Sequence, residues 1–337
     1  LLVASGTYAV WCSSGLETQM FAFWTVLGAY LYMREHRGQA RVPMSGFVFA
    51  LAAMTRPEGL LLMGLTGLHR VGANLLGERR VLPRASEVAW VLGFLIPFGL
   101  FFAWRYSYYG HPFPNTYYIK AGEGASASIS KWGLPYLWDF IKDNRLYVLP
   151  ALIPLFWPRS CGADCQTGRA GVRPWVIWSY LGLITLTYGA YVTSGGGDFM
   201  TLGRFFLPIL PFIALFTQEG LREAIERPRA GRLPDQWRPI PMVIVGVILV
   251  GLTAYNSKLI HTESKKLGYY RWGLDTVAYL RKFADDRVLI GTWMRHHLPK
   301  DTYLAVGGAG AIVYASRLKA LDTFGLNDAW IAHNTPK

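Results

Sequence analysis

The sequence predicts a polytopic α-helical membrane protein with a C-terminal α/β domain. Three observations support this fold class. Of the 337 residues, 52% are hydrophobic and only 16% are charged, whereas soluble domains carry roughly 25% charged residues. The apolar residues gather in stretches, several of which approach the roughly 20 residues that a membrane-spanning helix needs. Finally, the loops between successive apolar stretches alternate between loops rich in Lys and Arg and loops with few of them.

The composition also excludes several classes of protein. The mean hydropathy of +0.22 and the low charge exclude a disordered chain. Three cysteines are too few for a disulfide scaffold, and their spacing predicts no metal site. The formal net charge of +13 is explained by basic cytoplasmic loops, so we expect no nucleic-acid partner.

Apolar stretches divide the first 256 residues. Residues 1–11 are typical of the end of a helix, and we expect the natural chain to extend beyond both ends of this sequence. Two shorter stretches, 144–157 and 204–217, need tilt or flanking aromatic residues to cross a bilayer. The stretches that meet or approach the length of a full span are 16–33, 88–106, 174–194 and 239–256.

The loop charges predict the orientation. Fifteen arginines lie in the loops 34–43, 69–87, 158–173 and 218–238. The alternating segments 12–15, 107–143 and 195–203 carry only Lys120, Lys131 and Lys142. Because positive loops stay in the cytoplasm, the arginine-rich loops are predicted to be cytoplasmic. We therefore expect a multi-pass protein of the inner (cytoplasmic) membrane whose functional site faces the periplasm.

Residues 44–68 lie between two loops that are both predicted to be cytoplasmic. One straight helix would place those loops on opposite sides, so we expect two half-length helices that meet at Thr55–Gly59. Pro57 interrupts the helical hydrogen bonds and Gly59 allows a close turn. Non-helical backbone at membrane depth lines a cavity, so Arg56 and Glu58 are predicted to face one. The alternative is an Arg56–Glu58 salt bridge that only stabilises the bend.

The chain changes character after residue 256. We predict a transmembrane domain over 1–256 and an extracytoplasmic α/β domain, incomplete in this sequence, over 257–337. The pattern indicates a helix over 269–297, a strand over 302–306, a short helix and a second strand over 318–322. The glycines at 307, 308 and 310 do not have the spacing of a dinucleotide-binding fingerprint.

Polar residues are predicted to meet at the outer membrane face. Arg and Lys suit a phosphate group, so Arg56, Lys120 and Arg204 are candidates for it. Carboxylates suit the deprotonation of a hydroxyl, and the candidates are Glu17 and Asp198. The remaining lining residues are expected to be Glu58, Asn115, Tyr117 and Tyr118. A phosphate site beside an apolar groove at this face predicts a polyprenyl-phosphate lipid as the ligand.

Asp198 follows three glycines, which free the backbone to approach a ligand closely. Its carboxylate could then bind a sugar hydroxyl. Two structural interpretations remain open beside this one. Asp198 could cap the helix that follows, or it could form an ion pair with Arg204.

Five segments carry a resemblance to a known family: SGLET (14–18), LAAMTRPEGLLL (51–62), WRYSYYGHPFPNTYYIK (104–120), GGGDFMTLGRFFLPILP (195–211) and DTFGLNDAWIA (322–332). Together they make the chain similar to polytopic glycosyltransferases of the GT-C superfamily. Among these it most resembles the terminal β-1,2-arabinofuranosyltransferase family of actinobacterial cell walls.

The resemblance implies a GT-C-like fold and inverting sugar transfer, on the periplasmic side, from a polyprenyl-phosphate donor to a glycan or glycolipid acceptor of the cell envelope. It also implies that the main catalytic acid lies in an earlier outward loop, upstream of Leu1. No cofactor is predicted, and the role of a divalent metal is left open. Two other functions remain: a glycolipid transporter or flippase, and a polymerase or ligase of lipid-linked glycans.

Overall fold

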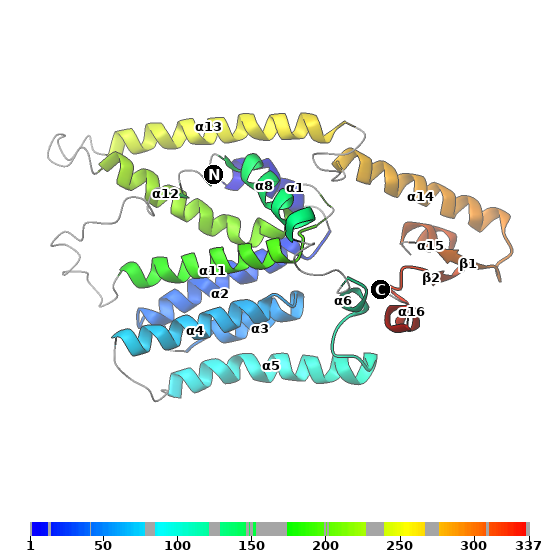
Figure 1. Cartoon of the computed structure of the whole chain (residues 1–337), viewed down its shortest axis with the longest axis horizontal. Helices are drawn as coiled ribbons and strands as arrows, with labels where there is room; N and C mark the ends of the chain where they lie inside the picture. Colours follow the sequence, from blue (N-terminus) through cyan, green and yellow to red (C-terminus); the bar gives the residue numbers. More distant parts are fainter. Residues whose placement is uncertain are drawn as a thin grey trace.

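A computed structural model shows a bundle of helices with a small α/β unit at one end (Figure 1). The structure describes residues 2–12, 15–40, 42–77, 85–120, 129–145, 148, 151–152, 174–198, 200, 202–226, 239–266, 276–307 and 310–334.

The first half of the bundle begins with two short elements, the 3₁₀-helix η1 (Leu2–Ala4) and α1 (Gly6–Cys12). The longer helices then follow in chain order: α2 (Thr18–His36), α3 (Ser45–Thr55), α4 (Gly59–Gly77) and α5 (Ala85–Tyr109). They lie side by side in Figure 1, where α3 is packed between its neighbours.

The second half contains short elements and three further long helices. The short elements are α6 (Asn115–Lys120), the π-helical turn η2 (Ile129–Gly133), α8 (Leu134–Asp143) and the 3₁₀-helix η4 (Arg204–Ile209). The long helices are α11 (Pro174–Ser194), α12 (Leu210–Glu226) and α13 (Pro239–Ser264).

Among the described residues, three helical segments are long and apolar enough to cross a membrane: Ala85–Tyr109, Val176–Ser194 and Val243–Thr262. They correspond to three of the four full-length spans expected from the sequence. The fourth stretch forms α2, which has 19 residues but carries polar residues such as Gln19 and Glu35 near its ends. The described chain is therefore a helical protein with the elements needed for membrane association.

The prediction for residues 44–68 is confirmed in its main feature. α3 ends at Thr55 and α4 begins at Gly59, so the chain turns back at Arg56–Glu58. A Cβ atom at Gly59 would lie 2.2 Å from the backbone nitrogen of Ala53, which only glycine avoids. α4 extends to Gly77, nine residues beyond the expected end.

Two other expectations are modified. The stretch 204–217 does not form one helix, because the 3₁₀ turn of η4, which contains Pro208, precedes α12. Most of 144–157 lies outside the described residues, and so do 78–84, 153–173 and 227–238. The segment 107–143, expected as a loop, contains the helices α6 and α8.

The core lies where α2, α3, α11 and η4 meet. Its largest fully buried side chains are aromatic, and they are Phe21, Tyr32, Phe49, Tyr180, Tyr188, Phe206 and Phe212. Because these rings come from both halves of the chain, their packing fixes the ends of α2 and α11 relative to η4.

The C-terminal unit is a strand–helix–strand motif. α14 (Val277–His297) is followed by β1 (Tyr303–Val306), α15 (Ala311–Ser316) and β2 (Lys319–Asp322), and α16 (Ala329–Asn334) completes it. The strands are parallel, with Tyr303 opposite Lys319 and Val306 opposite Asp322. Both strands confirm the sequence prediction. α14 begins at Val277, with the Thr276 side chain accepting a hydrogen bond from the Tyr279 amide. Residues 269–275 of the predicted helix lie outside the described residues.

Candidate functional site

Two ion-paired groups meet at one end of the bundle. We define the charged cluster as Glu17, Arg56, Glu58, Asp198 and Arg204. Glu17 directly precedes α2, and Arg56 and Glu58 form the turn between α3 and α4. Asp198 and Arg204 flank the connection from α11 to η4. All five residues therefore lie at helix ends rather than within helices.

Arg56 binds two carboxylates. Its Nη2 and Nε donate to the two oxygens of Glu58 at 2.7 and 3.3 Å, so the pair is bidentate. Its Nη1 donates to Glu17 Oε1 at 3.3 Å. The side chain of Arg56 is buried, whereas that of Glu17 is 43% exposed. The salt bridge that was left open as the alternative for Arg56 and Glu58 is thus present, and Glu17 extends it.

Asp198 pairs with Arg204. Asp198 Oδ2 lies 2.8 Å from Arg204 Nε, and only 3% of the Asp198 side chain is exposed. This is the ion-pair interpretation of the three that the sequence left open. Leu202 and Gly203 precede Arg204 in left-handed conformations, with φ of +65° and +60°. A buried leucine rarely adopts this conformation, and such strain is typical of functional segments.

Phe205 joins the two groups. Its ring centre lies 4.6 Å from the guanidinium carbon of Arg56 and 4.8 Å from that of Arg204. The structure therefore brings two of the three residues predicted to bind the phosphate, Arg56 and Arg204, onto one aromatic ring. Stacking on an aromatic face fixes a guanidinium without using its N–H groups.

Tyr136 of α8 is buried beside Phe205 and helps to hold it in place. Its hydroxyl accepts a hydrogen bond from the Phe205 amide at 3.2 Å. Burial raises the pKa of the Tyr136 phenol, and the nearby Asp198 carboxylate raises it further. The phenol therefore stays protonated. Gly197 packs on the same ring, where a Cβ atom would lie 2.4 Å from Tyr136 Cγ.

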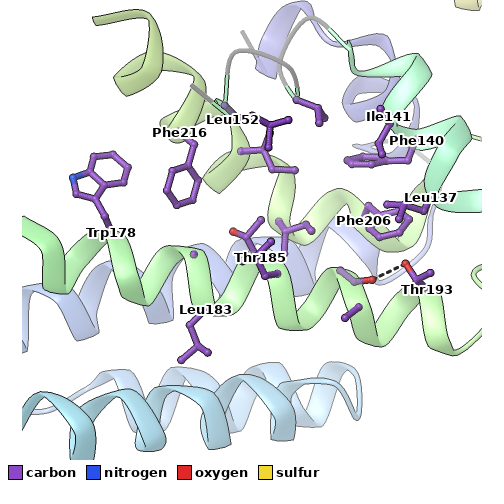
Figure 2. Close-up of a pocket in the computed structure, with 18 of the residues that line it drawn as sticks. Leu137, Phe140, Ile141, Leu152, Trp178, Leu183, Thr185, Thr193, Phe206 and Phe216 are labelled. Carbon is purple, nitrogen blue, oxygen red and sulfur yellow. Dashed lines mark hydrogen bonds between the residues drawn. The ribbon is translucent and has the colours of Figure 1, made fainter. Parts of the chain in front are cut away.

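An apolar groove leads to this end of the bundle. It has a volume of about 1060 Å³ and runs between α11, α8 and α12. Figure 2 shows Trp178 and Phe216 at one end and Phe206 and Thr193 at the other. Phe206, at this second end, directly follows Phe205, the ring on which both arginines of the charged cluster stack. The groove follows α11 for roughly 24 Å at 1.5 Å per residue.

The site residues that the sequence predicted within 115–120 lie on α6. Tyr117 lies near Tyr191 of α11, which in turn lies near Glu58 and Arg56. Tyr118 instead packs on His333 of α16, with ring centres 4.2 Å apart. Asn115 begins α6. The side chain of Lys120 lies outside the described residues, so its predicted phosphate contact stays a prediction.

The cluster has one more acid than base. Glu17, Glu58 and Asp198 together carry a formal charge of −3, against +2 for the two arginines. The acids differ in access, because Glu58 and Asp198 are largely buried in their pairs and Glu17 is half-exposed. Among the described residues, no group of three or more His, Cys, Asp or Glu side chains could hold a metal ion.

Comparison with known proteins reaches only the C-terminal unit. Residues 277–337 match a family that is described as a domain of unknown function (DUF8728). The matched segment begins at the first residue of α14. No curated protein and no solved structure matches the chain. The helical bundle is therefore interpreted from its own geometry.

Sequence reasoning missed the aromatic partners of the cluster. Phe205, Tyr136 and Tyr191 contact or influence the charged side chains, but none was a candidate. Tyr188 and Tyr191 lie three residues apart at the end of α11, just before the glycine-rich loop. Residues at this spacing share a helix face, which was the available signal. For Phe205 and Tyr136, 69 residues apart, the sequence offers none.

Proposed function

We propose that this protein is a membrane glycosyltransferase of the GT-C type, which moves a sugar from a polyprenyl-phosphate donor to a cell-envelope glycan or glycolipid. The observation that carries the proposal is that the apolar groove reaches Phe206, the residue next to Phe205, on whose ring both arginines of the charged cluster stack. The apolar groove suits an isoprenoid tail, and the charged cluster suits a sugar phosphate. The resemblance of the TRPEG and GGGDF segments to this superfamily supports the same function.

Arg56 is suited to the donor phosphate. Its Nε and Nη2 are held by Glu58, so the guanidinium is fixed in direction. The Nη1 contact to Glu17, the more exposed of the two carboxylates, is the one that a phosphate oxygen would replace. Charge-assisted hydrogen bonds to phosphate are stronger than neutral ones. The negative charge of the donor phosphate would also take the place of the Glu17 carboxylate beside Arg56 when Glu17 moves away.

Glu17, once released, is the accessible base. In the proposed reaction the acceptor hydroxyl loses its proton to Glu17 while its oxygen bonds to the anomeric carbon. The bond from that carbon to the phosphate oxygen breaks, and polyprenyl phosphate leaves with the electron pair beside Arg56. Asp198 takes no part in the proton transfer, because its carboxylate is buried against Arg204.

The orientation is part of the proposal. With the arginine-rich loops in the cytoplasm, the charged cluster faces the periplasm and the protein is a multi-pass protein of the inner membrane. Single cysteines in a cysteine-free background test this. A cysteine at Ser126 should react with an impermeant maleimide in sealed cells and one at Arg80 should not. The reverse pattern would overturn the orientation.

The decisive experiment is a transfer assay with the full-length protein in proteoliposomes, using polyprenyl phosphates that carry different radiolabelled sugars. We expect labelled sugar on the acceptor with at least one donor, and loss of this product in Glu17→Gln. Asp286→Asn, which changes an exposed acid on α14, is the matched control. Movement of label across the bilayer without transfer would instead indicate a flippase.

A further inference from the structure

The C-terminal unit contains a second pocket, outside the charged cluster. Its volume is about 380 Å³, within the range of small-ligand sites. Asp322 is the last residue of β2, and Asn327 and Asp328 follow it before α16. Gly310, Val313 and Tyr314 come from the connection between the strands, and Ala320 comes from within β2. The pocket therefore lies between α15 and β2 and reaches the carboxyl end of β2.

This position is where α/β proteins bind ligands. The carboxyl ends of parallel strands open into a crevice between the loops that leave them. Here the register places Val306 and Asp322 side by side at that edge. The edge is also held rigidly, because the Thr323 amide donates to the Val306 carbonyl at 3.0 Å.

The acceptors in the pocket are fixed by backbone amides. Asp322 Oδ1 accepts from the Phe324 amide at 3.1 Å and its Oδ2 accepts from the Asn327 amide at 2.8 Å. Asp328 Oδ1 accepts from the Ile331 amide at 3.0 Å. Each bonded carboxylate oxygen keeps a second lone pair, so it can still accept a hydrogen bond from a ligand hydroxyl.

The charge of the lining excludes a phosphate ligand. The described residues that line the pocket include two carboxylates and an amide, but neither Lys nor Arg. An anion would be repelled there, in contrast to a nucleotide site. A neutral ligand rich in hydroxyl groups donates hydrogen bonds to such a lining without adding charge.

Tyr314 supplies an apolar face at the rim. Its side chain is 86% exposed although it belongs to the helix that connects the strands. A tyrosine ring offers a flat surface and a hydroxyl together. A flat aromatic face beside carboxylate and amide groups is the pairing that suits a sugar ring, which has C–H bonds on its faces and hydroxyls at its edge.

We propose that the pocket formed by Tyr314, Asp322, Asn327 and Asp328 binds a neutral oligosaccharide. This site would give the C-terminal unit a glycan-binding role of its own. The proposal does not depend on the transfer reaction, because binding can be measured without a donor.

The test measures binding by the full chain in detergent, by saturation-transfer NMR and calorimetry. The probes are neutral pentasaccharides of arabinose, galactose, mannose and glucose. We expect one of them to bind, and Tyr314→Ala to weaken its binding about tenfold, as the loss of one aromatic contact implies. Asn327→Ala should also weaken binding, while keeping the backbone amide that holds Asp322.

Trp330→Ala is the matched control, because Trp330 is a similarly exposed aromatic residue outside the pocket lining. It should bind within twofold of wild type. The proposal is overturned if no pentasaccharide binds, or if Tyr314→Ala and Asn327→Ala bind as tightly as Trp330→Ala. Binding of ATP or of a lysine-rich peptide at this pocket, with no sugar binding, would also overturn it.

Discussion

Each end of the helical bundle holds a largely buried arginine paired with glutamate, but the two pairs differ in the solvent access of their glutamates. At the end away from the charged cluster, Glu35, Ser45, Arg70 and Trp90 form what we call the polar clamp. α2 separates Glu17 from Glu35 by roughly 27 Å at 1.5 Å per residue. The arginines of both pairs stack on aromatic rings, Arg70 on Tyr32 and Trp90.

The two glutamates differ in how their oxygens are used. Both oxygens of Glu35 are occupied, because the Ser45 amide donates to Oε1 at 2.7 Å, and the Ser45 hydroxyl and Arg70 donate to Oε2. Only 4% of the Glu35 side chain is exposed. Trp90 completes the clamp with a hydrogen bond to the Ser45 hydroxyl at 2.8 Å. The clamp thus ties α2, α3, α4 and α5 together.

The charged cluster has the opposite properties. It lies on turns, it has more acids than bases, and Glu17 makes one long contact with Arg56 while it remains half-exposed. The difference shows that a buried Arg–Glu pair does not by itself identify a functional site. Unused hydrogen-bonding capacity, solvent access and an adjoining groove distinguish the cluster from the clamp.

The largest effect is expected for Glu17→Gln, which should lower the rate of sugar transfer. This substitution keeps the size of the side chain but removes the base, and general-base catalysis contributes roughly 10²–10⁴-fold. We expect the initial rate of sugar transfer to fall by about this factor, with an unchanged melting temperature. A rate within threefold of wild type would exclude Glu17 as the base.

Glu35→Ala should act on stability. Removing one partner of a buried pair leaves a charge uncompensated and costs about 3–5 kcal/mol. We expect a lower thermal unfolding midpoint in detergent and a reduced yield of folded protein. Glu219→Ala, which breaks a pair between the more exposed Glu219 and Arg222, is the matched control and should change the midpoint little. Equal midpoints for the two variants would contradict the role of the clamp.

Arg56→Lys should have an effect of intermediate size, on the affinity for the donor. A lysine keeps the charge but cannot maintain the fork to Glu58 while it also binds a phosphate. The loss of one charge-assisted hydrogen bond is worth about 1.5–3 kcal/mol, or roughly 10- to 100-fold in donor affinity. Donor KM measured in the transfer assay checks this. An unchanged KM would remove Arg56 from the phosphate site.

The smallest effects are expected for substitutions of two tyrosines of α11, Tyr191 and Tyr180. Tyr191→Phe removes a hydroxyl beside the charged cluster, so we expect a loss of transfer rate of about 2- to 10-fold at unchanged stability. Tyr180→Phe removes a hydroxyl that is hydrogen-bonded to Thr66 at 2.9 Å in the core, and should cost about 1 kcal/mol of stability without a change in rate. If Tyr180→Phe lowered the transfer rate and Tyr191→Phe lowered the stability, the proposed division of the bundle into a functional and a structural end would be contradicted.

The sequence by itself determined the elements that depend on local pattern. Apolar length predicted α5, α11 and α13, and the Thr55–Gly59 segment predicted the α3–α4 turn, because Pro57 and Gly59 restrict the backbone wherever they occur. The strands β1 and β2 followed from their local composition in the same way. The candidates Glu17, Arg56, Glu58, Asp198 and Arg204 were found because charged residues near apolar segments are rare.

Only the tertiary structure decided how these residues are paired. Asp198 was open to three interpretations, and the structure shows the ion pair with Arg204. The placement of Phe205 between two arginines, and of Tyr136 behind it, depends on contacts between segments that are far apart in sequence. No local pattern encodes such contacts, because they arise when α2, α8, α11 and η4 bury their aromatic side chains against one another.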